Sequence, residues 1–439
     1  MRQVHHQILS QLAGHPRTRR GLGLCLAAGM AVGCGPSGAG SRGDHPERGA
    51  PVEPKTVVLG RTSGEPLPVV VTTGDGVVAL GEGTGLEYAR PRAGGYLVVD
   101  REKAELRFID PSGHLTGAVG RPGAGPAEFS DAIGRVLPLV GALAVPDIGN
   151  RRIGFVDPLS RSWLGSAPFP ESHGQPLLWG SGADGQLASL AIEPAGVVSL
   201  SLIRVPDGFT QAALATTVSL RGVVPTAGGL FRGFPILLSS PIGGLVAVAW
   251  PMTGRIEGYD DRGGLAEVFH LPAEAGPEIS EADRAAIRRI DRASDGGSDG
   301  PTEAQSNQAK RLALLLEQIP PEQREQARQH FGGKLGRADA GVARYPLFVD
   351  VHVDPVVQWL WLGAPLTAAD LDAAPNAVDW NFLRGTARVW RAYDLLGVPT
   401  AAVRIPFGIR VTDVHDGRFV GISQDDAGQR RAVVVTLAL

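Results

Sequence analysis

The stretch FVDVHVDP, residues 348–355, gathers the side chains best suited to chemistry. If it is an extended strand, alternation places Asp350, His352 and Asp354 on one face and the three intervening or preceding valines on the other. Two carboxylates and an imidazole on one face could hold a divalent cation or move a proton. In the alternative interpretation, Asp354 shapes the turn before Pro355, while Asp350 and His352 face water. The residues alone leave both interpretations open.

The remainder of the sequence carries no strong catalytic signature. It lacks a His-Glu-x-x-His zinc motif, a Gly-x-Ser-x-Gly elbow, a Walker loop and a cysteine pair for metal. No cofactor is therefore predicted, apart from the option of a divalent cation at the trio. The formal net charge of −3 gives no electrostatic reason to expect a nucleic-acid partner.

A repeat indicates which elements position these residues. The stretch GYLVVDREKAELRFIDPSG from Gly95 and the stretch ALAVPDIGNRRIGFVDPLS from Ala142 align at a constant offset of 47 residues, with Asp100 matching Asp147. Each contains an apolar run, an Asp, a polar turn and an alternating strand that ends in Asp-Pro, which is typical of a β-hairpin. Weaker copies follow from Gly244 and Ala387.

Several such units at a period near 50 residues predict an all-β fold, a six-bladed β-propeller of four-stranded antiparallel blades over residues 56–439. The C-terminal unit shows only three strands. We therefore expect the apolar stretch LPVVVTT, residues 67–73, to supply the fourth strand and close the ring. Residues 277–344 interrupt the pattern and are predicted to be a mostly helical insertion, with Ser280 and Asp283 as a capping box at its first helix.

The N-terminus predicts export. Residues 1–33 combine arginines with a short apolar stretch of small residues, as a secretory signal does. Residues 31–34, Ala-Val-Gly-Cys, resemble a bacterial lipobox, in which the cysteine, here Cys34, becomes the first mature residue and carries the lipid. The alternative is an ordinary cleaved signal with an incidental cysteine. Residues 34–55 have almost no large apolar side chain and read as a flexible tether.

The crossing between the two repeats carries a family resemblance. VGRPGAGPAEF, followed by ALAVPDIGNRRIGFVD, resembles an NHL repeat at Gly120, Gly125, Glu128, Phe129, Asp147, Asn150, Arg151, Ile153 and Phe155. The chain from about residue 86 onward resembles bacterial six-bladed β-propeller lipoproteins with NHL-like (TolB-like) repeats. This resemblance implies the fold and export more than an activity, because such propellers include lyases, hydrolases and modules that bind proteins, peptides or sugars.

These observations lead to one main hypothesis. The protein is an exported β-propeller, lipid-anchored to the membrane of the bacterial cell envelope, that binds a protein or a small-molecule ligand. The alternatives are a propeller enzyme, a metal-assisted hydrolase or lyase using Asp350, His352 and Asp354 at the channel mouth, and a structural role through the insertion. Within the repeat, we expect Phe129 to be buried between two sheets and Glu128 to make a local hydrogen bond.

Overall fold

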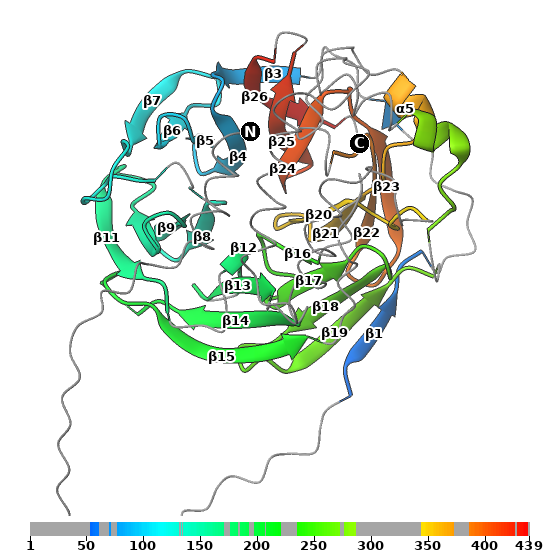
Figure 1. The fold of residues 1–439 in the computed structure, drawn as a ribbon, viewed down its shortest axis with the longest axis horizontal. Helices are drawn as coiled ribbons and strands as arrows, with labels where there is room; N and C mark the ends of the chain where they lie inside the picture. The colour runs from blue at the N-terminus through cyan, green and yellow to red at the C-terminus, as the bar shows by residue number, and fades with distance from the viewer. Residues whose placement is uncertain are drawn as a thin grey trace, which may run out of the picture. The chain divides into compact units, whose positions relative to one another are not determined.

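Six short antiparallel sheets surround a central axis (Figure 1). The structure is a computed structural model, and it describes residues 53–60, 70–71, 77–130, 133, 135–170, 176–182, 185–192, 197–206, 208–220, 235–272, 276–286, 344–372, 386–425 and 428–437. Each sheet forms one blade of a six-bladed propeller, with its strands in chain order from the axis to the rim except where an N-terminal strand is added at the rim of three blades. The six-bladed fold predicted from the repeat is thus confirmed.

Blade 1 consists of β4 (Leu86–Arg92), β5 (Gly95–Asp100), β6 (Glu105–Ile109) and β7 (Leu115–Val119). Blade 2 consists of β8 (Leu137–Leu139), β9 (Ala142–Asp147), β10 (Arg152–Val156) and β11 (Trp163–Pro168). Blade 3 consists of β12 (Pro176–Ser181), β13 (Leu187–Ile192), β14 (Val198–Arg204) and β15 (Ala213–Leu220). Blade 4 contains β16 (Ile236–Leu237), β17 (Val246–Trp250), β18 (Arg255–Tyr259) and β19 (Leu265–His270). Blade 5 contains β20 (Asp350–Asp354), β21 (Trp359–Gly363), β22 (Val389–Asp394) and β23 (Pro399–Arg404). Blade 6 contains β24 (Ile409–His415), β25 (Arg418–Gln424) and β26 (Arg430–Thr436).

The N-terminal strands lie on the outside of three successive blades. The strand β1 (Lys55–Val58) pairs in parallel with β19 of blade 4, and β2 (Val70–Val71) pairs in parallel with β23 of blade 5. The next strand, β3 (Val77–Glu82), pairs antiparallel with β26 and supplies the fourth strand of blade 6. An N-terminal strand therefore closes the ring.

The prediction that residues 67–73 form this closing strand was wrong. Of that stretch the structure describes Val70 and Val71, which add a fifth strand to blade 5 instead. The hydrophobic pattern did not discriminate between the two strands, because both are short valine-rich runs and only the partner edge distinguishes them.

The hydrophobic core is divided among the blade interfaces. Six clusters of buried side chains each join residues of two neighbouring blades, so every blade buries both faces of its sheet. Phe129, which is fully buried, lies between blades 1 and 2 with Leu106 of β6 and Val145 of β9, and it meets Trp163 edge-on at 5.6 Å. This burial of Phe129 between two sheets confirms the expectation from the sequence.

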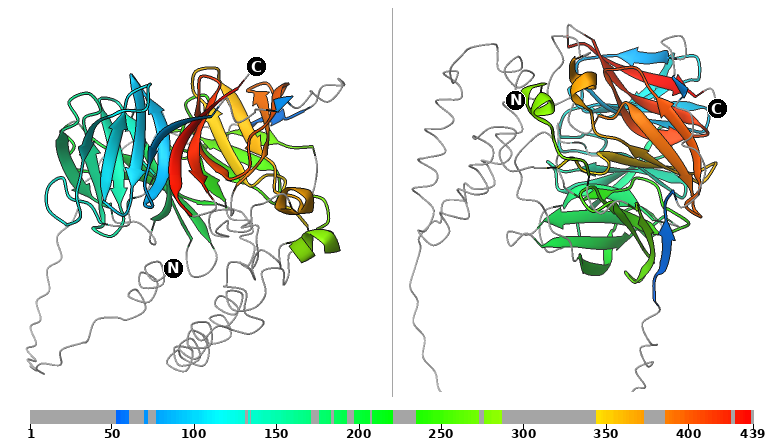
Figure 2. Two further views of the ribbon diagram at one scale, coloured as in Figure 1. Left: turned by 90° about the horizontal axis from the view of Figure 1, so that it is seen from above. Right: turned by 90° about the vertical axis from the view of Figure 1, so that its right-hand side faces the viewer.

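The two faces of the ring differ. Because strands alternate in direction, the turns between the first and second and between the third and fourth strands of blades 1 to 5 lie on one face, which we call the hairpin face. The other face, the crossover face, carries the blade-to-blade connections and the turns between second and third strands. It also carries the short helix α5 (Ala368–Asp372) and a helical turn at residues 281–286 (Figure 2).

The described ends of the predicted insertion are anchored on the crossover face. Ser280 and Asp283 form the expected capping box, with the Asp283 amide donating to Ser280 Oγ at 3.1 Å and the Ser280 amide donating to Asp283 Oδ2 at 3.1 Å. Asp283 Oδ1 also accepts from the amide of Ala368, which ties this turn to α5. The rest of the predicted insertion lies outside the described residues.

Residues 1–52, which include Cys34, also lie outside the described residues, so the signal and lipidation sites stay predictions. In the part of the chain that the structure describes, no helix is both long enough and apolar enough to span a bilayer.

Candidate functional site

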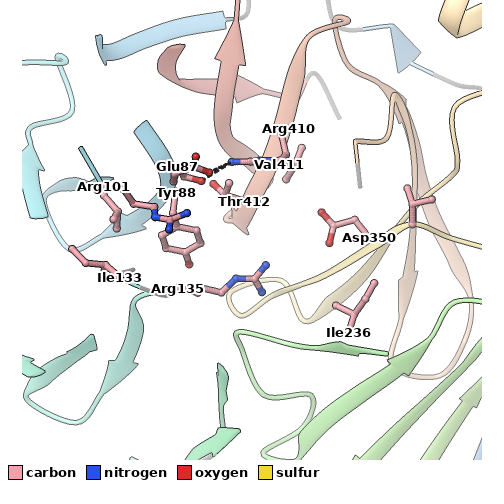
Figure 3. Close-up of a pocket in the computed structure, with 12 residues that line it drawn as sticks. Glu87, Tyr88, Arg101, Ile133, Arg135, Ile236, Asp350, Arg410, Val411 and Thr412 are labelled. Carbon is pink, nitrogen blue, oxygen red and sulfur yellow. Dashed lines mark hydrogen bonds and ion pairs between the residues drawn. The ribbon is translucent and has the colours of Figure 1, made fainter. Parts of the chain in front are cut away.

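A cavity of about 370 Å³ lies at the crossover-face end of the central channel (Figure 3). Its walls come from the innermost strands of five blades or from the residues beside them, because each such strand begins at this face. The lining residues are Glu87, Tyr88, Val99, Arg101, Ile133, Arg135, Ile236, Val349, Asp350, Arg410, Val411 and Thr412. The volume and the mixture of apolar and charged groups suit a small polar ligand.

One side of the cavity is a closed ionic cluster between blades 1 and 6. Arg410 Nη2 donates to Glu87 Oε2 at 3.0 Å and to the Glu87 carbonyl at 2.8 Å, and Arg430 pairs with Glu87 Oε1. Burial raises the pKa of Glu87, but the two guanidinium groups outweigh it, so the pKa of Glu87 is held below its ordinary value. This cluster is fixed by its own contacts.

The adjoining wall presents an arginine of a different kind. Arg135 precedes β8 and is half-buried, with its guanidinium carbon 5.8 Å from the centre of the Tyr88 ring. The described residues provide it with no hydrogen bond and no ion pair. Figure 3 shows its side chain extending into the opening. A partly desolvated cation without a counter-ion is a ready site for an anionic group.

Tyr88 adds a second unsatisfied group. Its ring is buried, and its hydroxyl has no hydrogen-bond partner among the described residues. Burial is the largest cause that raises the pKa of Tyr88 to about 12, so the phenol is neutral at physiological pH. A neutral hydroxyl beside Arg135 can donate to an acidic ligand oxygen.

Asp350 faces Arg135 from the opposite wall (Figure 3). Its Oδ1 accepts from the amide of Val351 at 2.9 Å, and its Oδ2 lies 3.2 Å from Nε2 of His352. His352 is buried against Trp390, with ring centres 5.6 Å apart, and its Nδ1 has no partner among the described residues. The pair thus places a carboxylate at the cavity with an imidazole behind it.

Asp354 is separated from this pair. It is fully buried and accepts from four backbone amides: Val356 at 2.9 Å and Val357 at 3.3 Å in its own turn, and Asp416 at 3.0 Å and Gly417 at 2.8 Å in blade 6. Asp354 therefore shapes a turn and joins blades 5 and 6, as the structural alternative proposed.

Side chains alternate between the two faces of β20 as predicted, but the face that carries His352 and Asp354 is covered by blade 6 and does not open to the channel. Val351 and Val353 pack toward blade 4, while His352 and Asp354 face blade 6, and only Asp350 reaches the cavity. The physical reason is that both faces of a propeller blade are covered by neighbouring blades. Among the described residues, no group of three or more His, Cys, Asp and Glu side chains is arranged to hold a metal ion.

The residues of the repeat form a second polar network, at the crossing from blade 1 to blade 2. Buried Asp147 accepts from Ser130, from Asn150 Nδ2 at 2.7 Å and from Arg152 Nε at 3.2 Å. Arg152 also donates to the carbonyls of Ala124, Gly125 and Glu128. The arginine that serves Asp147 is therefore Arg152, while Arg151 is exposed and occupies the turn with φ of 54°.

Glu128 makes the local hydrogen bonds that the sequence predicted. Its Oε2 accepts from the amide of Gly125 at 2.7 Å and its Oε1 from Arg121 Nε at 3.0 Å, and these bonds, the first above all, lower the pKa of Glu128. Gly120 has φ of 112°, and a Cβ there would lie 2.6 Å from the Phe129 ring. The first part of the crossing, residues 120–130, is thus a packed structural element, while Ile133 and Arg135 further along it line the cavity.

Most of the cavity residues were not found from the sequence. Glu87 and its neighbour Tyr88, Arg135 and Arg410 come from three separate stretches of the chain and belong to no motif. The one signal that could have found them is positional, because each stands at or just before the start of an innermost strand. The register of the repeat would have been needed in all six blades to use it.

Comparisons with known proteins give no family. No family model and no curated protein matches the chain. Among solved structures, a Bacteroides fragilis protein provisionally named as exported is 12% identical, with 88% of this chain and 100% of that chain covered and a TM-score of 0.44. Regucalcin, a calcium-binding protein from Agrobacterium tumefaciens, is 12% identical over 84% of this chain and 97% of that one, with a TM-score of 0.38.

A virginiamycin B lyase from Staphylococcus aureus is 10% identical, with 80% of this chain and 79% of that chain covered and a TM-score of 0.34. Similarities this low carry no argument about activity. The assignment of six blades rests on the pairing of the strands themselves.

Proposed function

We propose that the protein is an exported, lipid-anchored binding module whose propeller holds a small ligand with an acidic group in the channel cavity. Arg135 carries the proposal: its guanidinium stands at the cavity without an ion pair to any described residue, beside the Tyr88 hydroxyl, which has no hydrogen-bond partner in the same part of the chain. An anionic oxygen bound there would satisfy both groups. Asp350, on the opposite wall, would receive a hydrogen-bond donor or a cationic group of the same ligand.

The cellular context of the proposal comes from the sequence. Residues 1–33 would direct export, Cys34 would carry the lipid, and residues 34–55 would tether an NHL-like propeller to the membrane. A Cys34→Ser protein expressed in bacteria should lose labelling by radioactive palmitate. Continued labelling of that variant would contradict the anchor but not the binding site.

The binding site is tested with matched probes. Glutarate and its uncharged diamide, glutaramide, have the same length, and calorimetry should show that the protein prefers the acid. Arg135→Gln should lower the affinity for glutarate about tenfold or more and leave that for glutaramide unchanged, because only the acid uses the charge. An equal affinity of both probes, or of both proteins for glutarate, would contradict the proposal.

A propeller enzyme is the second candidate, and the Asp350–His352 pair favours it. A carboxylate held by a buried imidazole at a cavity wall can act as a general base in a hydrolase or lyase. Asp354 has no part in this version, because its oxygens already accept from four amides. Turnover lost in Asp350→Asn, with ligand binding retained, would favour the enzyme over the binding module.

A further inference from the structure

A second pair of arginines lies on the hairpin face, at the groove between blades 1 and 2. Arg92 ends β4 and Arg161 stands in the turn between β10 and β11. Both guanidinium groups cover the buried ring of Phe108, with their central carbons 5.1 Å and 6.0 Å from the ring centre. Two cations from different blades thus share one aromatic ring.

Neither arginine has an acidic partner in the described part of the chain. Arg92 Nη1 donates to the carbonyl of Ala93 at 3.0 Å, and Arg161 donates to the carbonyl of Thr116. The Nε of each is buried and makes no hydrogen bond with a described residue. Burial, and then the charge of Arg161, lower the pKa of Arg92.

Placing two cations over one ring costs more free energy than covering the ring requires. One guanidinium, or a neutral side chain of similar length, would shield Phe108 without repulsion between two cations. In the wall of the cavity, by contrast, the carboxylate of Glu87 neutralises two half-buried arginines, Arg410 and Arg430. A bound anion would supply at Arg92 and Arg161 the negative charge that the described residues do not supply.

The surroundings of the pair point to the source of that anion. Three aliphatic side chains project at turns of the same face and the same two blades: Leu115 is 60% exposed, Val140 77% and Leu159 79%. Aliphatic side chains beside a pair of cations are the combination that enters the interface of an anionic bilayer. A soluble anion would need the arginines only.

We propose that Arg92 and Arg161 form an oxyanion site for the phosphate of an anionic phospholipid headgroup, flanked by Leu115, Val140 and Leu159 at the bilayer surface. The site is independent of the cavity ligand, and it would also turn the hairpin face toward the membrane and leave the cavity on the far side. The strand β1 lies on the side of the ring opposite the short helices (Figure 2, right), so the chain joins the propeller there.

Vesicle sedimentation tests the site. All proteins carry Cys34→Ser, so that a lipid anchor cannot contribute and failure of the anchor leaves this test intact. The protein should bind phosphatidylglycerol vesicles more tightly than phosphatidylcholine vesicles. Arg92→Gln with Arg161→Gln should lower the partition coefficient onto phosphatidylglycerol about tenfold or more, because these two guanidinium groups would contact the headgroup phosphate directly.

The matched control removes the same charge from the same face. Arg262 and Arg418 are exposed in hairpin-face turns of blades 4 and 6, and Arg262→Gln with Arg418→Gln should change the partition coefficient less than threefold. Arg92→Lys with Arg161→Lys, which keeps the charge, should retain most of the binding and shows whether loss in the glutamine variant reflects misfolding.

Three results would overturn the proposal. The first is an equal loss of vesicle binding in the glutamine variant and its control, which would indicate a general charge effect. The second is binding that does not depend on either pair. The third is a combination of two observations: inorganic phosphate at constant ionic strength stabilises the protein only when Arg92 and Arg161 are present, and the protein shows no preference for phosphatidylglycerol vesicles. That result would make free phosphate, and not a lipid headgroup, the anion that the site binds.

Discussion

Two arginines at the crossing from blade 1 to blade 2 have opposite surroundings. Arg152 donates to one buried carboxylate and three carbonyls and has a side chain that is 15% exposed. Arg135, at the end of the same crossing, stands at the cavity with no hydrogen bond or ion pair to any residue that the structure describes. The difference separates an arginine that stabilises the fold from one available to a ligand.

The same contrast holds for two carboxylates of β20. Asp354 accepts from four amides and joins two blades, while Asp350 keeps its carboxylate at the cavity with one imidazole nitrogen and its own strand's amide as partners. In this propeller, residues of the same type that lie near one another differ in role according to how many hydrogen bonds and ion pairs the described residues give them. The following predictions test that distinction.

The largest expected effect on stability is at Phe129, in the packed crossing from blade 1 to blade 2. Phe129→Ala should lower the free energy of unfolding by about 3–5 kcal/mol, because it leaves a cavity between blades 1 and 2. Urea denaturation measures the change. Leu159→Ala, at an exposed turn, should change the same quantity by less than about 0.5 kcal/mol, and equal losses in the two variants would show that the crossing is not a packed element.

An intermediate effect on stability is expected at Glu87, whose carboxylate pairs with two arginines in the wall of the cavity. Glu87→Gln should lower the free energy of unfolding by about 1–3 kcal/mol at neutral pH, because it removes the partner of two arginines. Since the pKa of Glu87 is lower in the folded state than its ordinary 4.5, the difference should be full above about pH 5 and shrink as pH falls through the folded value. A difference that stays constant down to pH 2 would contradict the ionic cluster.

The smallest effect on stability is expected at Tyr88, on the unsatisfied wall. Tyr88→Phe should leave the free energy of unfolding within about 1 kcal/mol of the parent protein, because the hydroxyl loses no hydrogen bond to any residue that the structure describes. The affinity for glutarate should fall, but by less than in Arg135→Gln. A large loss of stability with unchanged affinity would place Tyr88 among the structural residues.

The fold was predictable because the repeat is local. Asp100 and Asp147 at a fixed offset, the Asp-Pro turns, and the packing of Phe129 are all readable within one unit of about 50 residues. The closing strand was not, because residues 70–71 and 77–82 carry the same kind of valine-rich pattern and only their pairing partners separate them.

One residue of the candidate site was predicted from the sequence, and the other residues were missed. The carboxylate of Asp350 was found through its alternation with His352, but alternation cannot say which face of a strand meets the channel. Arg135 and Tyr88 come from separate blades, and what distinguishes them is that no described residue pairs with the guanidinium or the hydroxyl. That property exists only once all six blades are placed.

The central claim is tested most directly by measuring stability and glutarate affinity together in Arg135→Gln and Arg152→Gln. The free energy of unfolding should stay within about 0.5 kcal/mol in Arg135→Gln and fall by about 2–4 kcal/mol in Arg152→Gln, which leaves buried Asp147 without its cation. Glutarate affinity should fall about tenfold or more in the first variant and persist in the folded fraction of the second. A loss of stability in Arg135→Gln equal to that in Arg152→Gln, with glutarate affinity unchanged, would contradict the account.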